Sequence, residues 1–233
     1  MKIWMKAVST LMRPNLIKTC PLNKKSRVDD SIIGVGELFD EKEVGFNAKV
    51  VTAICRELPA LTALNLSHNF ISNDGIEMLQ LTNMRVLVLN NTGINWMQVE
   101  ILRNSLPVIE ELHLMGNKLR EITRTTSITV QQFGSLRLIN LEDNYISNWD
   151  EILKLSQVRS LEKLHLNKNN LHRIWYPNCD TIHELLNGCG SLEKSNRPFQ
   201  NLRCLLLGSN NIEDLASIDS LNSFPTLKVR FVT

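Results

Sequence analysis

Six segments of the chain share one pattern of apolar and polar positions. The pattern reads Leu-x-x-Leu-x-Leu-x-x-Asn-x-Leu, with Ile, Met or Thr at a few of its positions. The six copies begin at Leu61, Met84, Ile109, Leu136, Leu161 and Leu202. Successive starts lie 23, 25, 27, 25 and 41 residues apart. Six matches at a nearly regular step indicate an internal repeat in which each copy forms one structural unit.

The central Leu-x-Leu of each copy predicts a short β-strand, because alternate residues of a strand point to opposite faces. The leucines then point into the protein, and the residues between them line an open face. This template at this period is typical of leucine-rich repeats. We therefore predict an α/β solenoid, a leucine-rich repeat horseshoe. Its parallel sheet lies on the concave side, with short helices or extended segments on the convex side.

The segments between the strands predict what covers the convex side. Asn95 and Asn148 each precede a Trp and a helical pattern, which is typical of N-caps. Residues 44–58 predict the return helix of an earlier repeat whose strand has degenerated. Residues 122–130 are β-branched and unfavourable for a helix, so we expect an extended return there.

The repeats divide the chain into two parts. We expect residues 1–40 to be a divergent, poorly ordered N-terminal segment and residues 41–233 to form the repeat domain. That domain has six clear repeats, a degenerate first repeat, a truncated last repeat and an insert at 175–198. Because a solenoid needs a cap over its last apolar layer, the early stop indicates a piece of a longer protein or an alternative product.

One polar position recurs within the template, and we expect its side chains to be buried. It holds Asn69, Thr92, Asn117, Asn144, Asn169 and Asn210. A buried amide is costly unless it is hydrogen-bonded. We therefore predict a structural ladder in which each side chain bonds backbone groups of its own and neighbouring turns. Thr92 has only one donor, so we expect the loosest contact there.

The residues between the leucines form the candidate partner-binding surface. They are Val86, Val88, Asn90, Glu111, His113, Met115, Leu138, Asn140, Glu142, Lys163, His165, Asn167 and Leu206. Apolar patches with polar residues between them are typical of protein-binding surfaces. The sequence has no Ser/His/Asp order, phosphate loop or pair of catalytic acids, so we expect no catalytic residues.

Composition and charge narrow the functional class. Lys and Arg number 26 against 24 Asp and Glu, a net charge of +2, which disfavours a nucleic-acid partner. No apolar stretch is long enough for a membrane span. The first 28 residues are basic, which fits a solvated terminus, with an organelle transit peptide as the alternative.

The cysteines and the insert offer two weaker candidates. Five cysteines at irregular spacings fit reduced cytosolic thiols rather than a disulfide framework. Cys179, His183 and Cys189 give only three zinc ligands where structural zinc needs four, so we expect no metal and no cofactor. Trp175 and Tyr176 either anchor a partner or pack against the edge of the coil.

Several strings are more specific than the repeat itself. They are LVLNNTGINWMQVEIL (87–102), EELHLMGNKL (110–119), LINLEDNYISNWDEI (138–152), LEKLHLNKNNL (161–171) and LRCLLLGSNNIEDLASIDSLNSFP (202–225). Together they resemble the leucine-rich domain of the tubulin-folding cofactor E family, and most closely its plant-like forms. The resemblance covers about 44–225.

The resemblance implies a cytoplasmic chaperone, associated with the cytoskeleton, that is not an enzyme. Family members bind α-tubulin and act with tubulin-folding cofactors D and C to assemble or disassemble the α/β-tubulin heterodimer. The family usually carries CAP-Gly and ubiquitin-like domains, whose patterns this sequence lacks. The alternative is a generic leucine-rich repeat scaffold or a phosphatase-regulator-type module, although that class keeps a stricter period.

Overall fold

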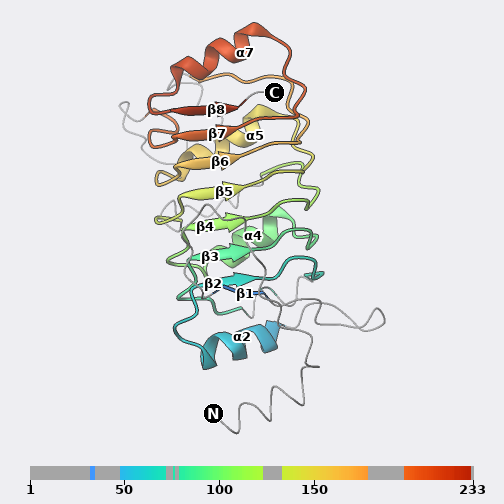
Figure 1. Ribbon diagram of the computed structural model, residues 1–233, viewed down its shortest axis with the longest axis vertical. Coiled ribbons are helices and arrows are strands. Elements are labelled where there is room, and N and C mark those ends of the chain that lie inside the picture. Colours follow the sequence, from blue (N-terminus) through green and yellow to red (C-terminus); the bar gives the residue numbers. More distant parts are fainter. Residues whose placement is uncertain are drawn as a thin grey trace.

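A computed structural model describes residues 32–34, 48–71, 76, 79–122, 133–177 and 197–231. Eight strands of three residues form one parallel sheet in chain order, stacked along the long axis of the molecule (Figure 1). The strands are β1 (Ile32–Gly34), β2 (Ala63–Asn65), β3 (Val86–Val88), β4 (Glu111–His113), β5 (Leu138–Asn140), β6 (Lys163–His165), β7 (Cys204–Leu206) and β8 (Val229–Phe231).

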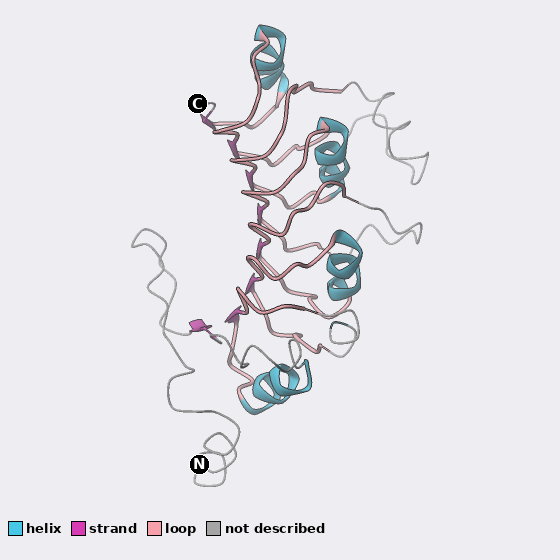
Figure 2. Ribbon diagram, turned by 90° about the vertical axis from the view of Figure 1, so that its right-hand side faces the viewer, coloured by secondary structure: helices cyan, strands magenta, loops and turns pink. Residues whose placement is uncertain are grey.

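The helices lie on the opposite side of the molecule from the strands, and the strand side curves gently inward (Figure 2). They are α2 (Ala48–Glu57), α4 (Trp96–Arg103), α5 (Trp149–Leu153) and α7 (Leu215–Ser220), with 3-10 turns η1 (Lys154–Gln157) and η2 (Leu221–Ser223). The predicted leucine-rich repeat solenoid is confirmed. The predicted extended return at 122–130 lies almost wholly outside the described residues.

The sheet extends beyond the six clear repeats at both ends. β1 pairs with β2 in parallel, so the sheet starts at Ile32, before the predicted boundary at residue 41. β8 pairs with β7 and matches Cys204 with Val229, which places Leu227 on schedule as the start of a seventh repeat. The same register sets Arg230 opposite Leu205, so this strand departs from the template at a leucine position.

The template leucines form one continuous core from Val51 to Leu227. The middle residue of each strand from β2 to β7 is fully buried. These residues are Leu64, Leu87, Leu112, Ile139, Leu164 and Leu205. Burying one such side chain contributes about 1.5–3 kcal/mol, so the stacked leucines stabilise the coil. Trp96 and Trp149 are buried at the starts of α4 and α5 and close the core on the convex side.

Both predicted N-caps are present. The Asn95 Oδ1 accepts from the backbone N of Gln98 at 3.0 Å, and the Gln98 Oε1 accepts from the backbone N of Asn95 at 2.8 Å. This reciprocal pair is a capping box. The Asn148 Oδ1 accepts from the backbone N of Asp150 at 2.9 Å, and two acids in the first turn favour the helix start electrostatically.

We expect Asn95→Ala to lower the free energy of unfolding by about 1 kcal/mol, because it removes an N-cap acceptor. Urea denaturation followed by circular dichroism measures this loss. Asn104→Ala, at the exposed opposite end of α4, is the matched control and should change the free energy by less than about 0.5 kcal/mol. Equal losses in the two variants would contradict the capping role.

Candidate partner-binding surface

The concave face consists of three columns of side chains that run across the strands. The register matches Val86, Glu111, Leu138 and Lys163 in the first column. It matches Val88, His113, Asn140, His165 and Leu206 in the second. Backbone bonds between adjacent repeats align Asn90, Met115, Glu142 and Asn167 in the third. The residues that the template places between and after the leucines therefore line up across the strands.

The apolar members of these columns are less accessible than an open face suggests. Val88 and Leu138 are each only 8% exposed, whereas Val86 and Leu206 are half-buried. A branched side chain between larger neighbours on a sheet loses most of its contact with water to them. The accessible part of this face therefore consists mainly of polar and long side chains, and Lys163 is the exposed member among them.

Acids and histidines gather at the centre of the concave face. The His113 Nε2 lies 3.4 Å from the Glu111 Oε2 on β4, and the His165 Nδ1 lies 4.0 Å from the Glu142 Oε1. The Asn167 Nδ2 donates to the same Glu142 oxygen. Each carboxylate thus has a polar neighbour that limits the motion of its side chain. Side chains held in this way lose less conformational entropy when a surface is bound.

Burial and hydrogen bonding set the charges of this group. The hydrogen bond with His113 lowers the pKa of the Glu111 carboxyl, although partial burial opposes the effect. Burial lowers the pKa of His165, and the nearby Glu142 carboxylate opposes that shift. At neutral pH the face therefore presents an ionised Glu111 beside a neutral His165.

Three predicted contact asparagines also hold the backbone of the sheet. The Asn90 Oδ1 accepts from the backbone N of Met115, and the Asn140 Oδ1 accepts from that of Glu142, both at 2.9 Å. The Asn167 Oδ1 accepts from the backbone N of Gly208 at 2.7 Å. The side-chain oxygens of these asparagines therefore stabilise the backbone of the sheet, a role that the template did not predict.

The recurrent asparagines lie behind the concave face and link neighbouring repeats. The Asn144 Oδ1 accepts from the backbone N atoms of Asn117 at 3.0 Å and Leu119 at 2.9 Å. Its Nδ2 lies 3.0 Å from the carbonyl oxygens of Leu114 and Leu141. Asn117, Asn169 and Asn210 bond adjacent repeats in the same manner.

The chain reaches this ladder through a left-handed residue in every repeat. The residue before each ladder position has a positive φ between 54° and 71°. These residues are His68, Asn91, Gly116, Asp143, Lys168 and Ser209. This conformation costs roughly 1–2 kcal/mol for a non-glycine residue. It turns the chain out of the strand and brings the next side chain inward, where the ladder hydrogen bonds offset the cost.

Thr92 shows how a shorter side chain fits the ladder. The Thr92 Oγ1 donates to the Leu89 carbonyl at 3.0 Å, and the Asn117 Oδ1 accepts from the Thr92 backbone N at 2.8 Å. In the preceding repeat, the backbone N of Ile71 donates to the Thr92 backbone carbonyl at 3.2 Å. A backbone oxygen thus takes the place that an amide oxygen fills in the later repeats.

The two aromatic residues at the start of the insert pack against the coil. The Trp149 Nε1 donates to the Trp175 carbonyl at 2.7 Å, and the Tyr176 hydroxyl donates to the Pro198 carbonyl at 3.0 Å. Both side chains are half-buried against the core. Of the two interpretations of these residues, the structure shows the packing role. Residues 178–196 of the insert, which include Cys179, His183 and Cys189, lie outside the described residues.

Within the described ranges, no three or more His, Cys, Asp and Glu side chains are arranged to bind a metal ion. No helix in the same ranges has the length and apolar character needed to cross a membrane.

The sequence that forms this repeat domain is similar to that of known proteins. The chain is 58% identical over 190 residues to "Tubulin-folding cofactor E" of Arabidopsis thaliana. This chain is a leucine-rich repeat relative of tubulin-folding cofactor E. The match covers 82% of this chain but 33% of the Arabidopsis protein, so the chain spans about a third of that cofactor E.

A more distant relative agrees with this assignment, and a solved structure agrees with the fold. "Tubulin-specific chaperone cofactor E-like protein" of Homo sapiens is 33% identical over 182 residues, covering 76% of this chain and 39% of that protein. A solved chain in the TLR13–ssRNA13 complex covers 87% of this chain and 29% of its own length at 18% identity, with a TM-score of 0.52. That likeness shows the fold alone. No family model matches the chain.

The names of the cofactor E relatives indicate a role in tubulin folding. They are named as a folding cofactor and as chaperones rather than as enzymes. The cofactor E resemblance and the leucine-rich repeat fold are thus shown for this chain.

Proposed function

We propose that the concave face of this chain binds α-tubulin and that the protein takes part in assembling or disassembling the α/β-tubulin heterodimer. By the same resemblance, tubulin-folding cofactors D and C are its further partners. The observation that supports this proposal is 58% identity to Arabidopsis tubulin-folding cofactor E over 82% of the chain.

The geometry of the concave face supports its role as the contact surface. His113 and Met115 project from the repeat of β4, and His165 projects from β6, two rungs and so about 10 Å away; the strands are fixed by buried leucines and by the asparagine ladder. A surface held in place by the fold loses little conformational entropy on binding. On the convex side, Trp96 and Trp149 are buried in the core, so these two side chains are not available for contact.

We expect the triple variant His113→Ala, Met115→Ala, His165→Ala to bind native tubulin dimer at least about tenfold more weakly than the parent chain. Size-exclusion chromatography detects the complex, and fluorescence titration gives its dissociation constant. The affinity falls because the variant removes three central side chains from the contact while leaving the buried core intact.

A control variant can replace the same three residue types, two His and one Met, elsewhere in the chain. His68→Ala, Met97→Ala, His172→Ala removes the same residue types from exposed positions off the concave face, and Met97 itself is 50% exposed. This variant should bind within about twofold of the parent chain. Equal weakening by both variants would contradict a concave contact. A well-folded parent chain that does not bind tubulin would leave the generic scaffold interpretation in place.

A further inference from the structure

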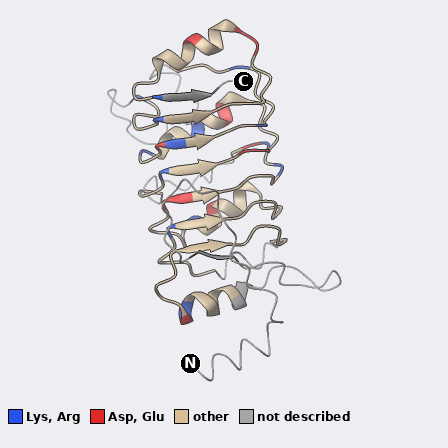
Figure 3. Ribbon diagram, viewed as in Figure 1, with Lys and Arg blue, Asp and Glu red and all other residues tan. Residues whose placement is uncertain are grey.

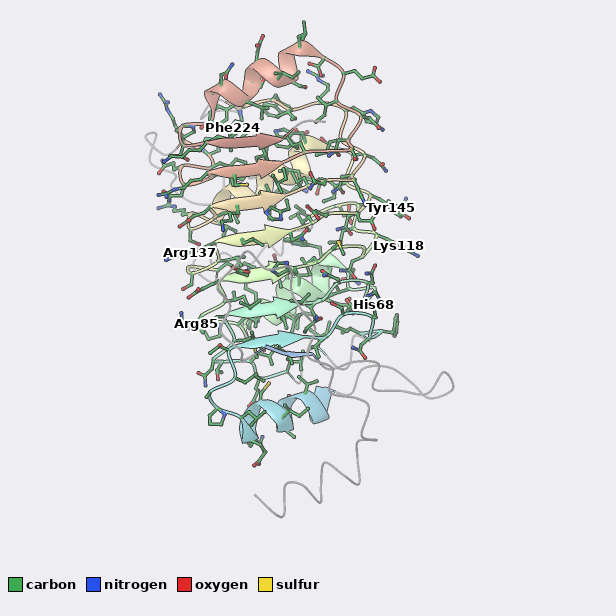
Figure 4. All side chains as sticks on the ribbon, in the orientation of Figure 1. His68, Arg85, Lys118, Arg137, Tyr145 and Phe224 are labelled. Carbon is green, nitrogen blue, oxygen red and sulfur yellow. The ribbon has the colours of Figure 1, made fainter. Side chains whose placement is uncertain are left out.

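A column of charged residues follows the edge of the sheet at which the strands begin. It consists of the residue before each strand from β3 to β8, namely Arg85, Glu110, Arg137, Glu162, Arg203 and Lys228. From Glu110 onward, each backbone N donates to the carbonyl of the member one repeat earlier at 2.8–2.9 Å. Neighbours in the column therefore lie on adjacent rungs, and Figure 4 labels Arg85 and Arg137 on this edge.

The charges in this column alternate at first and then stop alternating. Arg85 forms an ion pair with Glu110, and the Arg137 Nη1 lies 3.8 Å from the Glu162 Oε1. Two cations follow, Arg203 and Lys228, with no acid between them. Both are exposed, and neither forms a salt bridge within the part of the chain that the structure describes.

Two further cations extend the positive surface at the same end. Arg159 is exposed, and its carbonyl accepts from the Asn201 Nδ2 at 2.8 Å, which places it beside the turn that leads into β7. Lys163 is exposed at the start of β6 and is close enough to lower the pKa of the Cys204 thiol, against the larger effect of burial. Arg137, Arg159, Lys163, Arg203 and Lys228 together form what we call the basic edge.

Within residues 197–231, the acids lie away from this edge. Glu213 and Asp214 precede α7, and Asp219 lies within it, on the convex side. Figure 3 shows this separation, with blue segments at the starts of the later strands and red segments on α7 and the loop before it. Glu110 and Glu162, the neighbours of Arg137 in the column, are the acids that the column itself supplies near the five cations of the basic edge.

We propose that the basic edge binds an acidic polypeptide segment in an extended conformation, crossing β5 to β8. Arg137 and Lys228 lie three rungs apart, about 14 Å, which an extended segment of four to five residues spans. Arginine pairs with carboxylates through two parallel hydrogen bonds, and the long side chains of the edge adjust to their spacing. This surface lies outside the three concave columns apart from Lys163, and the inference does not depend on the proposed tubulin contact.

An acidic polypeptide suits this edge better than a nucleic acid does. Glu162 lies within the edge and would repel phosphates, which are fixed in the nucleic-acid backbone, whereas a peptide carries its carboxylates on flexible side chains that can turn away from Glu162. Binding of single strands also uses exposed aromatic side chains for base stacking. Near this end of the coil, Phe199 and Phe224 are buried and Tyr176 packs against Phe224.

A fluorescein-labelled decaglutamate peptide tests the inference by fluorescence anisotropy at low salt. The double variant Arg203→Gln, Lys228→Gln should bind it about tenfold more weakly than the parent chain. The control Lys118→Gln, Lys168→Gln removes two exposed cations from the opposite edge and changes the net charge equally, so it should bind within about twofold of the parent.

Three results would overturn the inference. An equal loss of affinity in the two variants would mean that decaglutamate binding depends on the net charge of the protein alone. Tighter binding of a labelled oligothymidylate of equal charge would assign the edge to nucleic acid. Absence of decaglutamate binding by the folded parent chain at low salt would remove the site altogether. Far-ultraviolet circular dichroism confirms that each variant is folded before titration.

Discussion

Phe224→Ala is expected to lower the free energy of unfolding by about 4 kcal/mol. Phe224 is 3% exposed, and its ring centroid lies 4.8 Å from that of Tyr176, 5.9 Å from that of Phe199 and 6.5 Å from that of Trp149. The substitution leaves a ring-sized cavity where the insert, α5 and the last repeat meet. Urea denaturation measures the loss, and the fluorescence of nearby Trp149 reports on this end of the coil.

Phe70→Ala is the matched control for Phe224. Phe70 is 68% exposed, so its removal should change the free energy of unfolding by less than about 0.5 kcal/mol. A Phe224 variant as stable as the Phe70 variant would show that the aromatic cluster does not hold the last repeat in place.

Asn144→Ala is expected to lower the free energy of unfolding by about 3 kcal/mol. Asn144 is 2% exposed, and its amide oxygen accepts from two backbone N–H groups of the preceding repeat. Its NH₂ group lies within hydrogen-bonding distance of three backbone carbonyls. Alanine has no amide, so these buried backbone N–H and C=O groups lose their hydrogen bonds to it. Thermal and urea unfolding both measure the effect.

Asn170→Ala provides the comparison for Asn144. Asn170 is exposed in the next repeat, and only its backbone N takes part in a bond between repeats, with the Ile146 carbonyl at 3.0 Å. We expect a change below about 0.5 kcal/mol. If the Asn144 and Asn170 variants unfold at the same temperature, the hydrogen bonds of the ladder do not stabilise the protein as proposed.

The sequence predicted the parts of the fold that repeat. The spacing of leucines fixed both the strands and their register, because each repeat can bury its apolar side only against its neighbours. The N-caps at Asn95 and Asn148 were predictable because their signals are local. The strand at Ile32–Gly34 was not, because Ile32-Ile-Gly34 carries no leucine template and is recognised only by pairing with β2.

The surface was harder to predict than the fold. The template gave the concave columns but not their exposure, which depends on how neighbouring side chains cover one another, as at Val88 and Leu138. The second role of Asn140, as an acceptor for the backbone N of Glu142, depends on backbone geometry that the pattern does not encode. The charged residues of the column are visible in the sequence as the residue before each strand. Only the register of the sheet shows that they lie side by side.

Differential thiol labelling tests the concave contact most directly. Cys204 lies in the first concave column, Cys55 lies in α2, and both are half-buried thiols whose pKa is raised by burial. In a chain with Cys20, Cys179 and Cys189 replaced by serine, mass spectrometry measures maleimide modification of both thiols with and without native tubulin. We predict that tubulin slows modification of Cys204 and leaves Cys55 unchanged. Protection of Cys55 with no protection of Cys204, under conditions in which the complex forms, would contradict binding on the concave face.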